Sequence, residues 1–243
     1  MKSLIIIPAF NEASCIASVV ADVRAYVPGA TVLVMDDGSA DATANEARRA
    51  GAEVLRLPFN CGIGVAVQAG FAFGVAEGFD IVARVDGDGQ HVAADLPAVI
   101  APVAEDRADF SVGSRFLAAG ADSEAAAASF QSSFSRRLGI RWFKTLLRFV
   151  AGRAVTDPTS GFCAANRRAA AVLAGGCASD YPEVDAVVLL SRAGLRLTEV
   201  PARMRDRQAG ASSISGLAPL RYMIKVTMAI AVTWSRGPAT AGS

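Results

Sequence analysis

Histidine and cysteine are scarce in this sequence, which holds one histidine and four cysteines among 243 residues. The cysteines, Cys15, Cys61, Cys163 and Cys177, form no C-x-x-C pair, so neither a disulfide framework nor a structural zinc site is indicated. A protein without either is expected in a reducing compartment, and we therefore expect the cytoplasm.

Long apolar runs are also missing. The apolar run at residues 4–7 is too short for the core of a signal peptide and is typical of a first strand. Within the mostly apolar residues 217–236, the longest uncharged run covers residues 226–235, which is shorter than the roughly 20 apolar residues that a transmembrane helix needs. Any membrane attachment is therefore expected to be peripheral or through a membrane protein partner.

A strong overall charge is absent as well, because the formal net charge is only +1. Basic residues are nevertheless concentrated: residues 131–153 and 201–243 each hold six Lys or Arg, with Asp206 as the single acid among them. This asymmetry predicts an anionic surface as a partner. The acidic remainder of the chain would repel a long nucleic acid, so we expect a membrane and no nucleic acid.

Hydrophobic residues make up 52% of the chain, enough to build the core of one large domain. Short β-branched runs alternate with longer alanine-rich segments, which is typical of an α/β fold with a mostly parallel sheet flanked by helices. The expected strands are residues 4–7, 31–35, 53–57, 81–85 and 110–112. We expect this domain to cover residues 1–213, with a loop at residues 116–131.

Two later segments are amphipathic. Arg137, Arg141, Lys144 and Arg148 recur at helical spacing on one stripe. Residues 217–236, within a tail at 214–243, are nearly all apolar and predict a C-terminal helix that lies in a membrane interface. Two helices packed on the core, with solvated basic faces, would explain the same patterns.

Two aspartates separated by one glycine follow the apolar run at residues 79–85. Asp86 and Asp88 would lie at the carboxyl edge of the sheet, where open α/β sheets bind ligands. Carboxylate oxygens there are suitable ligands for a divalent cation on a diphosphate. An ordinary Asp-Gly turn would also account for these residues.

The loops after the other strands narrow the choice of ligand. Residues 8–12, PAFNE, lack the glycine fingerprint of a dinucleotide-binding protein, which argues against a nicotinamide enzyme. Gly62, Gly64 and Gly70 have the wrong spacing for such a loop and predict a closely packed helix start. Asp36 and Asp37 end the second strand, where a carboxylate can hold a ribose hydroxyl or a base edge, and Ser39 or Asp41 is expected to cap the next helix.

Taken in order, the motifs PAFNE, DDGSADAT, NCGIG, DGDGQH and GSRF resemble the inverting family 2 glycosyltransferases of the GT-A fold. The later stretches at residues 156–162 and 199–212 are similar to those of dolichyl or polyprenyl phosphate mannose synthases and their glucosyl relatives. This resemblance covers the chain from Ser3 to about Ser213. It implies a Rossmann-like GT-A sheet that binds a nucleotide diphosphate sugar.

The resemblance also implies roles for individual residues. The base and ribose would lie among Pro8, Ala9, Glu12 and Asp37. The diphosphate, with Mg²⁺ or Mn²⁺, would be held by Asp86, Asp88 and Gln90, of which Asp88 is also counted as catalytic. Phosphate oxygens of the donor would contact Arg115, and those of the acceptor would contact Arg115, Arg207 and Ser212, with Arg207 also counted as catalytic.

The acceptor decides whether a general base is needed. A sugar hydroxyl must lose its proton, whereas a lipid phosphate is already anionic and can attack C1 directly. The glutamate of the mannose synthases corresponds to Asp185 here, with Glu183 two residues earlier. Either residue is a candidate catalytic group, and both could instead stabilise the start of a helix. Ile63 and Val65 replace a basic residue that related synthases often have, so one phosphate contact is expected to be missing.

These observations favour an inverting glycosyltransferase at the inner membrane face. It would move mannose or glucose from GDP-mannose or UDP-glucose to a polyprenyl or dolichyl phosphate. A soluble sugar-to-sugar transferase in surface polysaccharide synthesis is the alternative within enzymes, with Glu183 or Asp185 as a base. The alternative that is not an enzyme is a scaffold that binds a nucleotide sugar without turnover.

Overall fold

The structure is a computed structural model of the chain, and it describes residues 1–118, 156–157, 159–176 and 182–205. Several sequence predictions lie outside these residues. They are the basic stripe at residues 137–148, the C-terminal amphipathic segment with the boundary at 213/214, and the candidate site residues Arg207 and Ser212.

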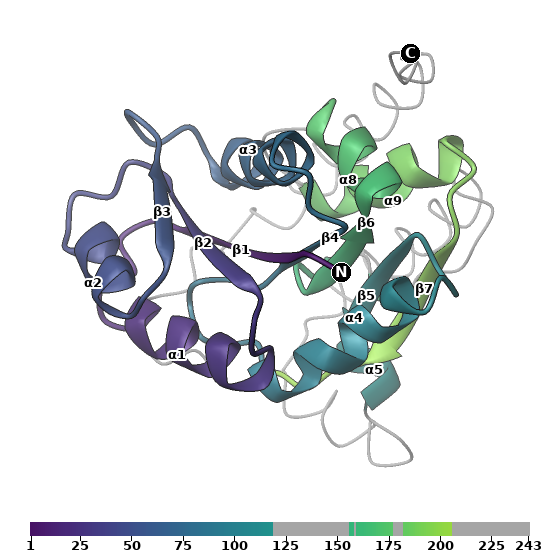
Figure 1. Cartoon of the computed structure of the whole chain (residues 1–243), viewed down its shortest axis with the longest axis horizontal. Helices are drawn as coiled ribbons and strands as arrows, with labels where there is room; N and C mark the ends of the chain where they lie inside the picture. Colours follow the sequence, from purple (N-terminus) through teal and green to yellow (C-terminus); the bar gives the residue numbers. More distant parts are fainter. Residues whose placement is uncertain (119–155, 158, 177–181, 206–243) are drawn as a thin grey trace, which may run out of the picture.

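The core of the fold is a seven-stranded sheet with the order β3-β2-β1-β4-β6-β5-β7. The strands are β1 (Ser3–Ala9), β2 (Thr31–Asp36), β3 (Glu53–Arg56), β4 (Ile81–Arg84), β5 (Phe110–Ser114), β6 (Cys163–Asn166) and β7 (Leu197–Pro201). Only β6 among these strands runs antiparallel to its neighbours. The predicted mostly parallel α/β sheet is confirmed, and all five expected strands form (Figure 1).

Helices cover both faces of the sheet (Figure 1). On one face lie α1 (Ile16–Tyr26) and α4 (Leu96–Ala104), and on the other lie α3 (Ile63–Ala76), α8 (Arg167–Ala174) and α9 (Pro182–Arg192). The shorter helices are α2 (Thr43–Arg49), the 3₁₀ turn η1 (Ala93–Asp95) and α5 (Arg115–Ala118). Among the described residues, no helix is long and apolar enough to cross a membrane.

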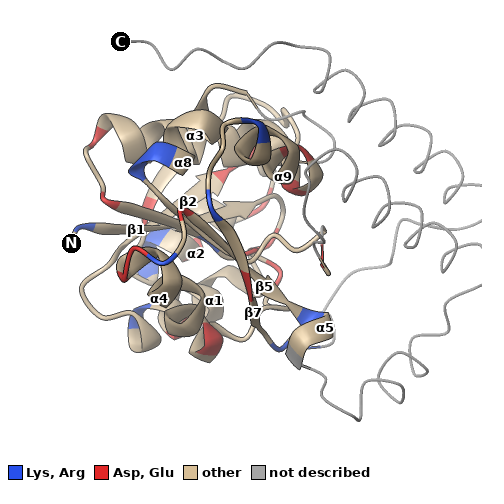
Figure 2. Ribbon diagram, turned by 90° about the vertical axis from the view of Figure 1, so that its right-hand side faces the viewer, with Lys and Arg blue, Asp and Glu red and all other residues tan. Residues whose placement is uncertain are grey.

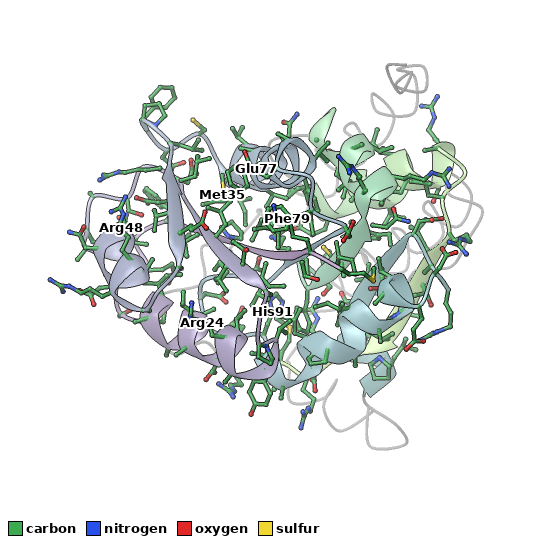
Figure 3. All side chains as sticks on the ribbon, in the orientation of Figure 1. Arg24, Met35, Arg48, Glu77, Phe79 and His91 are labelled. Atoms are coloured by element: carbon green, nitrogen blue, oxygen red, sulfur yellow. The ribbon has the colours of Figure 1, made fainter. Side chains whose placement is uncertain are left out.

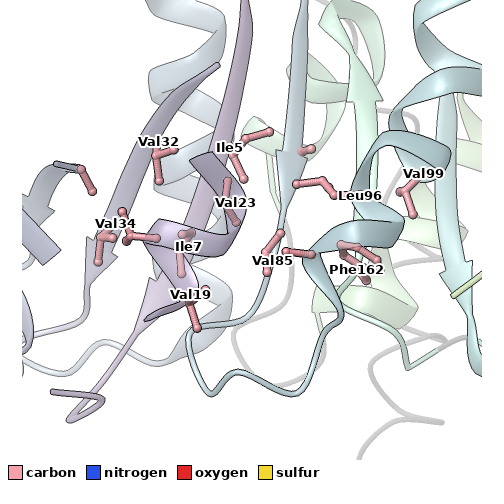
Figure 4. Packing of buried hydrophobic residues seen from close by; sticks show 14 of the residues in the cluster. Ile5, Ile7, Val19, Val23, Val32, Val34, Val85, Leu96, Val99 and Phe162 are labelled. Atoms are coloured by element: carbon pink, nitrogen blue, oxygen red, sulfur yellow. The ribbon is translucent and has the colours of Figure 1, made fainter. Parts of the chain in front are cut away.

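Alternation along β1 divides the core into two layers. Ile5 and Ile7 pack with the side chains of α1 and α4 (Figure 4), whereas Leu4 and Ile6 face α3. Met35 and Phe79, labelled in Figure 3, belong to the α3 layer. Because β1 is buried on both faces, its sequence is a continuous apolar run rather than an alternating one.

The structure corrects three details of the sequence analysis. The strand β6 was not predicted, because its sequence CAAN contains two alanines, which have low strand propensity. The expected loop at residues 116–131 begins as the short helix α5. Neither Ser39 nor Asp41 caps α2, because the helix begins at Thr43; Asp41 accepts from the Thr43 amide (2.9 Å) and Ser39 accepts from the Asn11 amide (2.9 Å).

The close backbone packing that was predicted for the start of α3 is found further along the helix, at Gly70. Gly62, which has φ +96°, precedes the helix. Further along it, a Cβ atom on Gly70 would lie 3.0 Å from Cδ1 of Ile6 on β1. The described cysteines, Cys15, Cys61 and Cys163, are free thiols, as expected.

Candidate active site

The strand order places a crevice beyond the carboxyl ends of β1 and β4. From β1 the chain continues outward to β2 and β3 on one side, while β4 lies on the other side. In open α/β sheets, such a reversal of strand order is where ligands bind. The loops at residues 10–15 and 85–91 flank this point in the structure (Figure 1).

The end of β1 joins the loops of its two neighbours. The carbonyl oxygen of Ala9 accepts from the Asp37 amide (2.9 Å), and that of Pro8 accepts from the Gly87 amide (3.3 Å). Glu12, in the following loop, donates its amide to Thr43 Oγ1 (2.8 Å). The residues proposed to surround the base and ribose are therefore brought to one place.

Asp37 is buried and holds backbone in place. One of its carboxylate oxygens accepts from the Cys61 amide (2.7 Å) and the other from the Gly62 amide (2.9 Å). These bonds fix the start of α3 to the end of β2. Its neighbour Asp36 forms an ion pair with Arg56 (3.3 Å) and accepts from the Ser39 amide (3.0 Å).

Residues 86–90 form a turn that carries the two candidate cation-binding carboxylates. Asp88 Oδ1 accepts from the Gln90 amide (3.1 Å), and the Gln90 carbonyl accepts from the Arg205 amide (2.7 Å). The Asp-Gly turn and the two carboxylates at the edge of the sheet, given above as alternatives, are thus the same segment. Asp86, Asp88 and Gln90 offer two carboxylates and an amide oxygen, which suit a divalent cation that keeps water and phosphate ligands as well. The described residues contain no group of three or more His, Cys, Asp or Glu that could hold a metal.

A buried arginine lies behind this turn. The Arg84 side chain is 3% exposed and contacts Asp86 Oδ1 through Nε (3.0 Å) and Nη2 (2.8 Å), while its Nη1 lies 2.8 Å from Glu183 Oε1. Burial alone would raise the pKa of Asp86, but the charge of the Arg84 guanidinium in particular outweighs it and lowers that pKa. Asp86 is therefore held as a carboxylate. Arg84 was not among the predicted site residues, although a charged residue inside an apolar strand was a signal for it.

His91 supports the same turn from the other layer. Its ring stacks on Phe162 with centroids 4.8 Å apart, and its Nδ1 accepts from the Asp86 amide (3.1 Å). Burial lowers the pKa of His91 against the opposing effect of Asp86, so the ring is neutral near pH 7. Because Nδ1 accepts a hydrogen bond, the proton is assigned to Nε2, which lies 3.9 Å from Asp86 Oδ2.

The two candidate acids on α9 differ in position. Glu183 and Asp185 both lie in the first turn of the helix, where a negative charge is favourable. The Glu183 side chain is 19% exposed and reaches Arg84, whereas Asp185 is buried. The structure thus brings Glu183 into contact with Arg84, the last residue of β4.

Arg115 is held by a second group of acids beside the turn. Its Nε and Nη2 contact Asp157 Oδ2 and Oδ1 at 2.7 Å each, and Nη2 also donates to Thr159 Oγ1 (3.0 Å). Glu199 on β7 accepts from the Thr156 and Asp157 amides at 2.8–3.0 Å. The helix α5 and the strand β7 lie side by side at this edge (Figure 2). Arg115 thus forms an ion pair with Asp157, whose side chain is fully buried.

The positions of Asp157 and Glu199 could not be derived from spacing alone, because they lie 42 residues or more from Arg115 in the chain. Both belong to motifs that were singled out without assigned roles. Together with Arg84 and His91, they are the site residues that were not predicted from the sequence.

Comparison with known proteins agrees with this geometry. The family model "Glycosyl transferase family 2" matches residues 4–173. The undecaprenyl-phosphate mannosyltransferase of Micrococcus luteus is 32% identical over 96% of both chains. The polyprenol monophosphomannose synthase of Mycolicibacterium smegmatis is 29% identical over 93% of this chain and 85% of its own length.

Among solved structures, a glucosyl-3-phosphoglycerate synthase from Mycobacterium tuberculosis shares the fold. It was crystallised with Mn²⁺, UDP-glucose and phosphoglyceric acid. It covers 98% of this chain and 81% of its own, with a TM-score of 0.69 and 22% identity. The GT-A expectation for the sheet is confirmed by this similarity of fold.

Proposed function

Because this chain belongs to glycosyl transferase family 2, we propose that it transfers a hexose from a nucleotide diphosphate sugar to a polyprenyl phosphate. The observation that carries this proposal is the full-length similarity to an undecaprenyl-phosphate mannosyltransferase, 32% over 96% of both chains. The geometry supports it, because carboxylates for a cation and an oriented arginine meet at the crevice where the strand order reverses.

The donor would bind across the ends of β1, β2 and β4. Pro8, Ala9, Glu12 and Asp37 would surround the base and ribose. Asp86, Asp88 and Gln90 would hold Mg²⁺ or Mn²⁺ on the diphosphate, where such a cation neutralises the leaving nucleoside diphosphate. Arg115, fixed by Asp157, would direct its guanidinium toward phosphate oxygens.

In the transfer, an oxygen of the lipid phosphate attacks C1 of the hexose from the side opposite the diphosphate. The bond between C1 and the diphosphate oxygen breaks, its electron pair leaves with the nucleoside diphosphate, and C1 is inverted. An anionic phosphate has no proton to lose at the attacking oxygen, so this reaction needs no general base. That agrees with a site in which Asp185 is buried and Glu183 is paired with Arg84.

The first test is transfer of radiolabel from GDP-mannose and UDP-glucose into an organic-extractable product. The assay contains undecaprenyl phosphate with Mg²⁺ or Mn²⁺. We expect label in the lipid phase, and its loss with EDTA and with Asp88→Asn. The matched control is Asp80→Asn, because Asp80 is an exposed acid at the opposite edge that binds the Lys2 amide (2.7 Å). Label that stays aqueous with every donor, or passes to a saccharide, would refute the lipid acceptor.

In this proposal, the chain acts as a peripheral protein at the cytoplasmic face of a membrane. The basic stripe at Arg137, Arg141, Lys144 and Arg148 and the amphipathic residues 217–236 would supply the contact, and each cation near an anionic surface contributes roughly 1 kcal/mol. Sedimentation with vesicles that contain anionic lipid tests this part separately. Absence of binding at low salt would remove the membrane contact and leave the transfer reaction to its own assay.

A further inference from the structure

Arg84 lies between the turn at residues 86–90 and the first turn of α9. It is the last residue of β4, and its side chain points toward the layer of α3, α8 and α9, as Val82 does two residues earlier. The turn with Asp86 follows it directly, and Glu183 approaches from the first turn of α9. One guanidinium therefore touches two carboxylates that come from segments about 100 residues apart.

The nitrogen atoms of the Arg84 guanidinium are shared between Asp86 and Glu183. Nε and Nη2 face Asp86 Oδ1 at 3.0 and 2.8 Å, and Nη1 faces Glu183 Oε1 at 2.8 Å. Gly161 backs this arrangement, because a Cβ atom there would lie 2.7 Å from Arg84 Nη2 and 2.8 Å from Asp86 Oδ2. Little room is left for Arg84 to change its partners.

The surroundings make Arg84 depend on both carboxylates. A cavity of about 20 Å³ beside it is lined mainly by apolar side chains such as Val67, Phe71 and Leu173, so water solvates the guanidinium poorly. Burial alone would lower the pKa of Arg84, but Asp86 and Glu183 together outweigh it and raise that pKa. The Arg84 guanidinium therefore stays charged, and it interacts with both carboxylates.

We propose that Arg84 is a positioning residue that couples Glu183 to Asp86, so that the charge on Glu183 sets how strongly the turn at residues 86–90 binds a divalent cation. This inference rests on the proposed function. The Glu183 carboxylate takes up part of the charge of Arg84 and leaves Asp86 available to a divalent cation. If a substitution removes the charge of residue 183, Arg84 pairs with Asp86 alone and competes with the metal for its oxygens.

The test is a double-mutant cycle read out as Mn²⁺ affinity, measured by calorimetry on the purified full chain. Glu183→Gln removes the charge and keeps the shape, and Arg84→Met removes the connection while filling similar volume. We expect Glu183→Gln to weaken Mn²⁺ binding roughly fivefold or more when Arg84 is present, and less than about twofold in the Arg84→Met background. Glu105→Gln, which breaks the exposed ion pair with Arg107, is the control for charge loss and leaves the affinity unchanged.

Other outcomes separate the possible failures. If Glu183→Gln weakens Mn²⁺ binding equally in both backgrounds, the effect is a direct one of charge and the coupling is overturned. No weakening of Mn²⁺ binding in either background would overturn it as well. If Arg84→Met does not fold, as judged by circular dichroism, Arg84→Lys replaces it. A lysine amine cannot fork to both acids, so the effect of Glu183→Gln should still fall by half or more. A wild-type protein that binds nucleotide but no Mn²⁺ would contradict the metal role in the proposed function, and the coupling would fall with it.

Discussion

Arg115 and Asp157 face each other fork to fork, with Nε–Oδ2 and Nη2–Oδ1 distances of 2.7 Å each. The Asp157 side chain is fully buried, whereas that of Arg115 is 40% exposed. Asp157 also accepts from the Arg115 amide (3.2 Å), so the acid fixes both the backbone and the side chain of the arginine. The exposed part of the guanidinium is thereby presented to the site in one orientation.

Asp157→Asn should lower kcat/KM for sugar transfer by about 10- to 100-fold, because the amide cannot accept both charge-assisted bonds of the arginine. The shape of the side chain is kept, so the protein should remain folded. Steady-state kinetics at varied donor concentration measure the effect, and circular dichroism checks the fold. Thr159→Ala, which removes the bond from Arg115 Nη2 and a longer one donated to Asp157 Oδ1 (3.3 Å) but keeps the ion pair, is the milder control. Activity of Asp157→Asn at the wild-type level would contradict the role of this pair.

Gly161→Ala should disturb the contact between Arg84 and Asp86 without unfolding the protein. The added Cβ atom would lie within 2.8 Å of both side chains, so at least one of them must shift. Displacement of a binding carboxylate by a fraction of an ångström is expected to lower activity on the order of 10- to 100-fold.

The matched control is Gly175→Ala, where the nearest atom to a Cβ would be Val172 O at 3.4 Å, an ordinary contact. Transfer assays on both variants compare them directly. Equal activity of the two would show that the space beside Arg84 and Asp86 is not limiting.

Asp109 is expected to stabilise the fold from the edge of the sheet opposite the site. It accepts from the Arg196 amide (2.8 Å), the Arg196 side chain (3.1 Å) and Asn166 Nδ2 (2.8 Å), and the Arg196 bonds in particular lower its pKa from 3.8 to about 2. Such a shift corresponds to roughly 2 kcal/mol of stability. Because the pKa is lower in the folded state, this contribution is complete above pH 3.8 and is lost as the pH falls toward 2.

Urea unfolding of Asp109→Asn should therefore show a loss of roughly 2 kcal/mol at pH 7 and a smaller loss near pH 3. Asp106→Asn provides the comparison, because Asp106 pairs with the same arginine but is 86% exposed, and it should change the stability little. A pH-independent loss for Asp109→Asn would assign the effect to shape rather than charge.

The single histidine of the chain gives a direct measure of the electrostatics near the turn. Burial lowers the pKa of His91 below its usual 6.5, so its ring should titrate below that value in the folded protein and near it in urea. Proton NMR follows this one imidazole without assignment of other residues. Since the unfolded chain takes up the proton first, stability should fall as the pH drops below 6.5. A midpoint at or above 6.5 in the folded state would contradict the neutral ring.

Five of the seven strands and the motifs at their ends were predicted from the sequence, because β-branched runs and turn residues are local signals. The strand order could not be predicted, since the pairing of β4 with β6 joins residues 81–84 to 163–166 across more than 75 intervening residues. The convergence of Asp86, Asp88 and Gln90 on one turn was foreseen because they are adjacent in the chain. The partners of Arg84 and Arg115 were not, because contacts between distant segments leave no periodic signal.

The reversed direction of β6 has a consequence for how this scaffold can diversify. Because β5 ends and β6 begins at the same edge, the chain leaves the sheet at α5 and returns at Thr156 on the site side. Arg205, four residues after β7, donates its amide to the Gln90 carbonyl (2.7 Å) at that edge too. The chain between β5 and β6 therefore leaves and rejoins the sheet at one edge, so a change in its length does not require a change in the strand order.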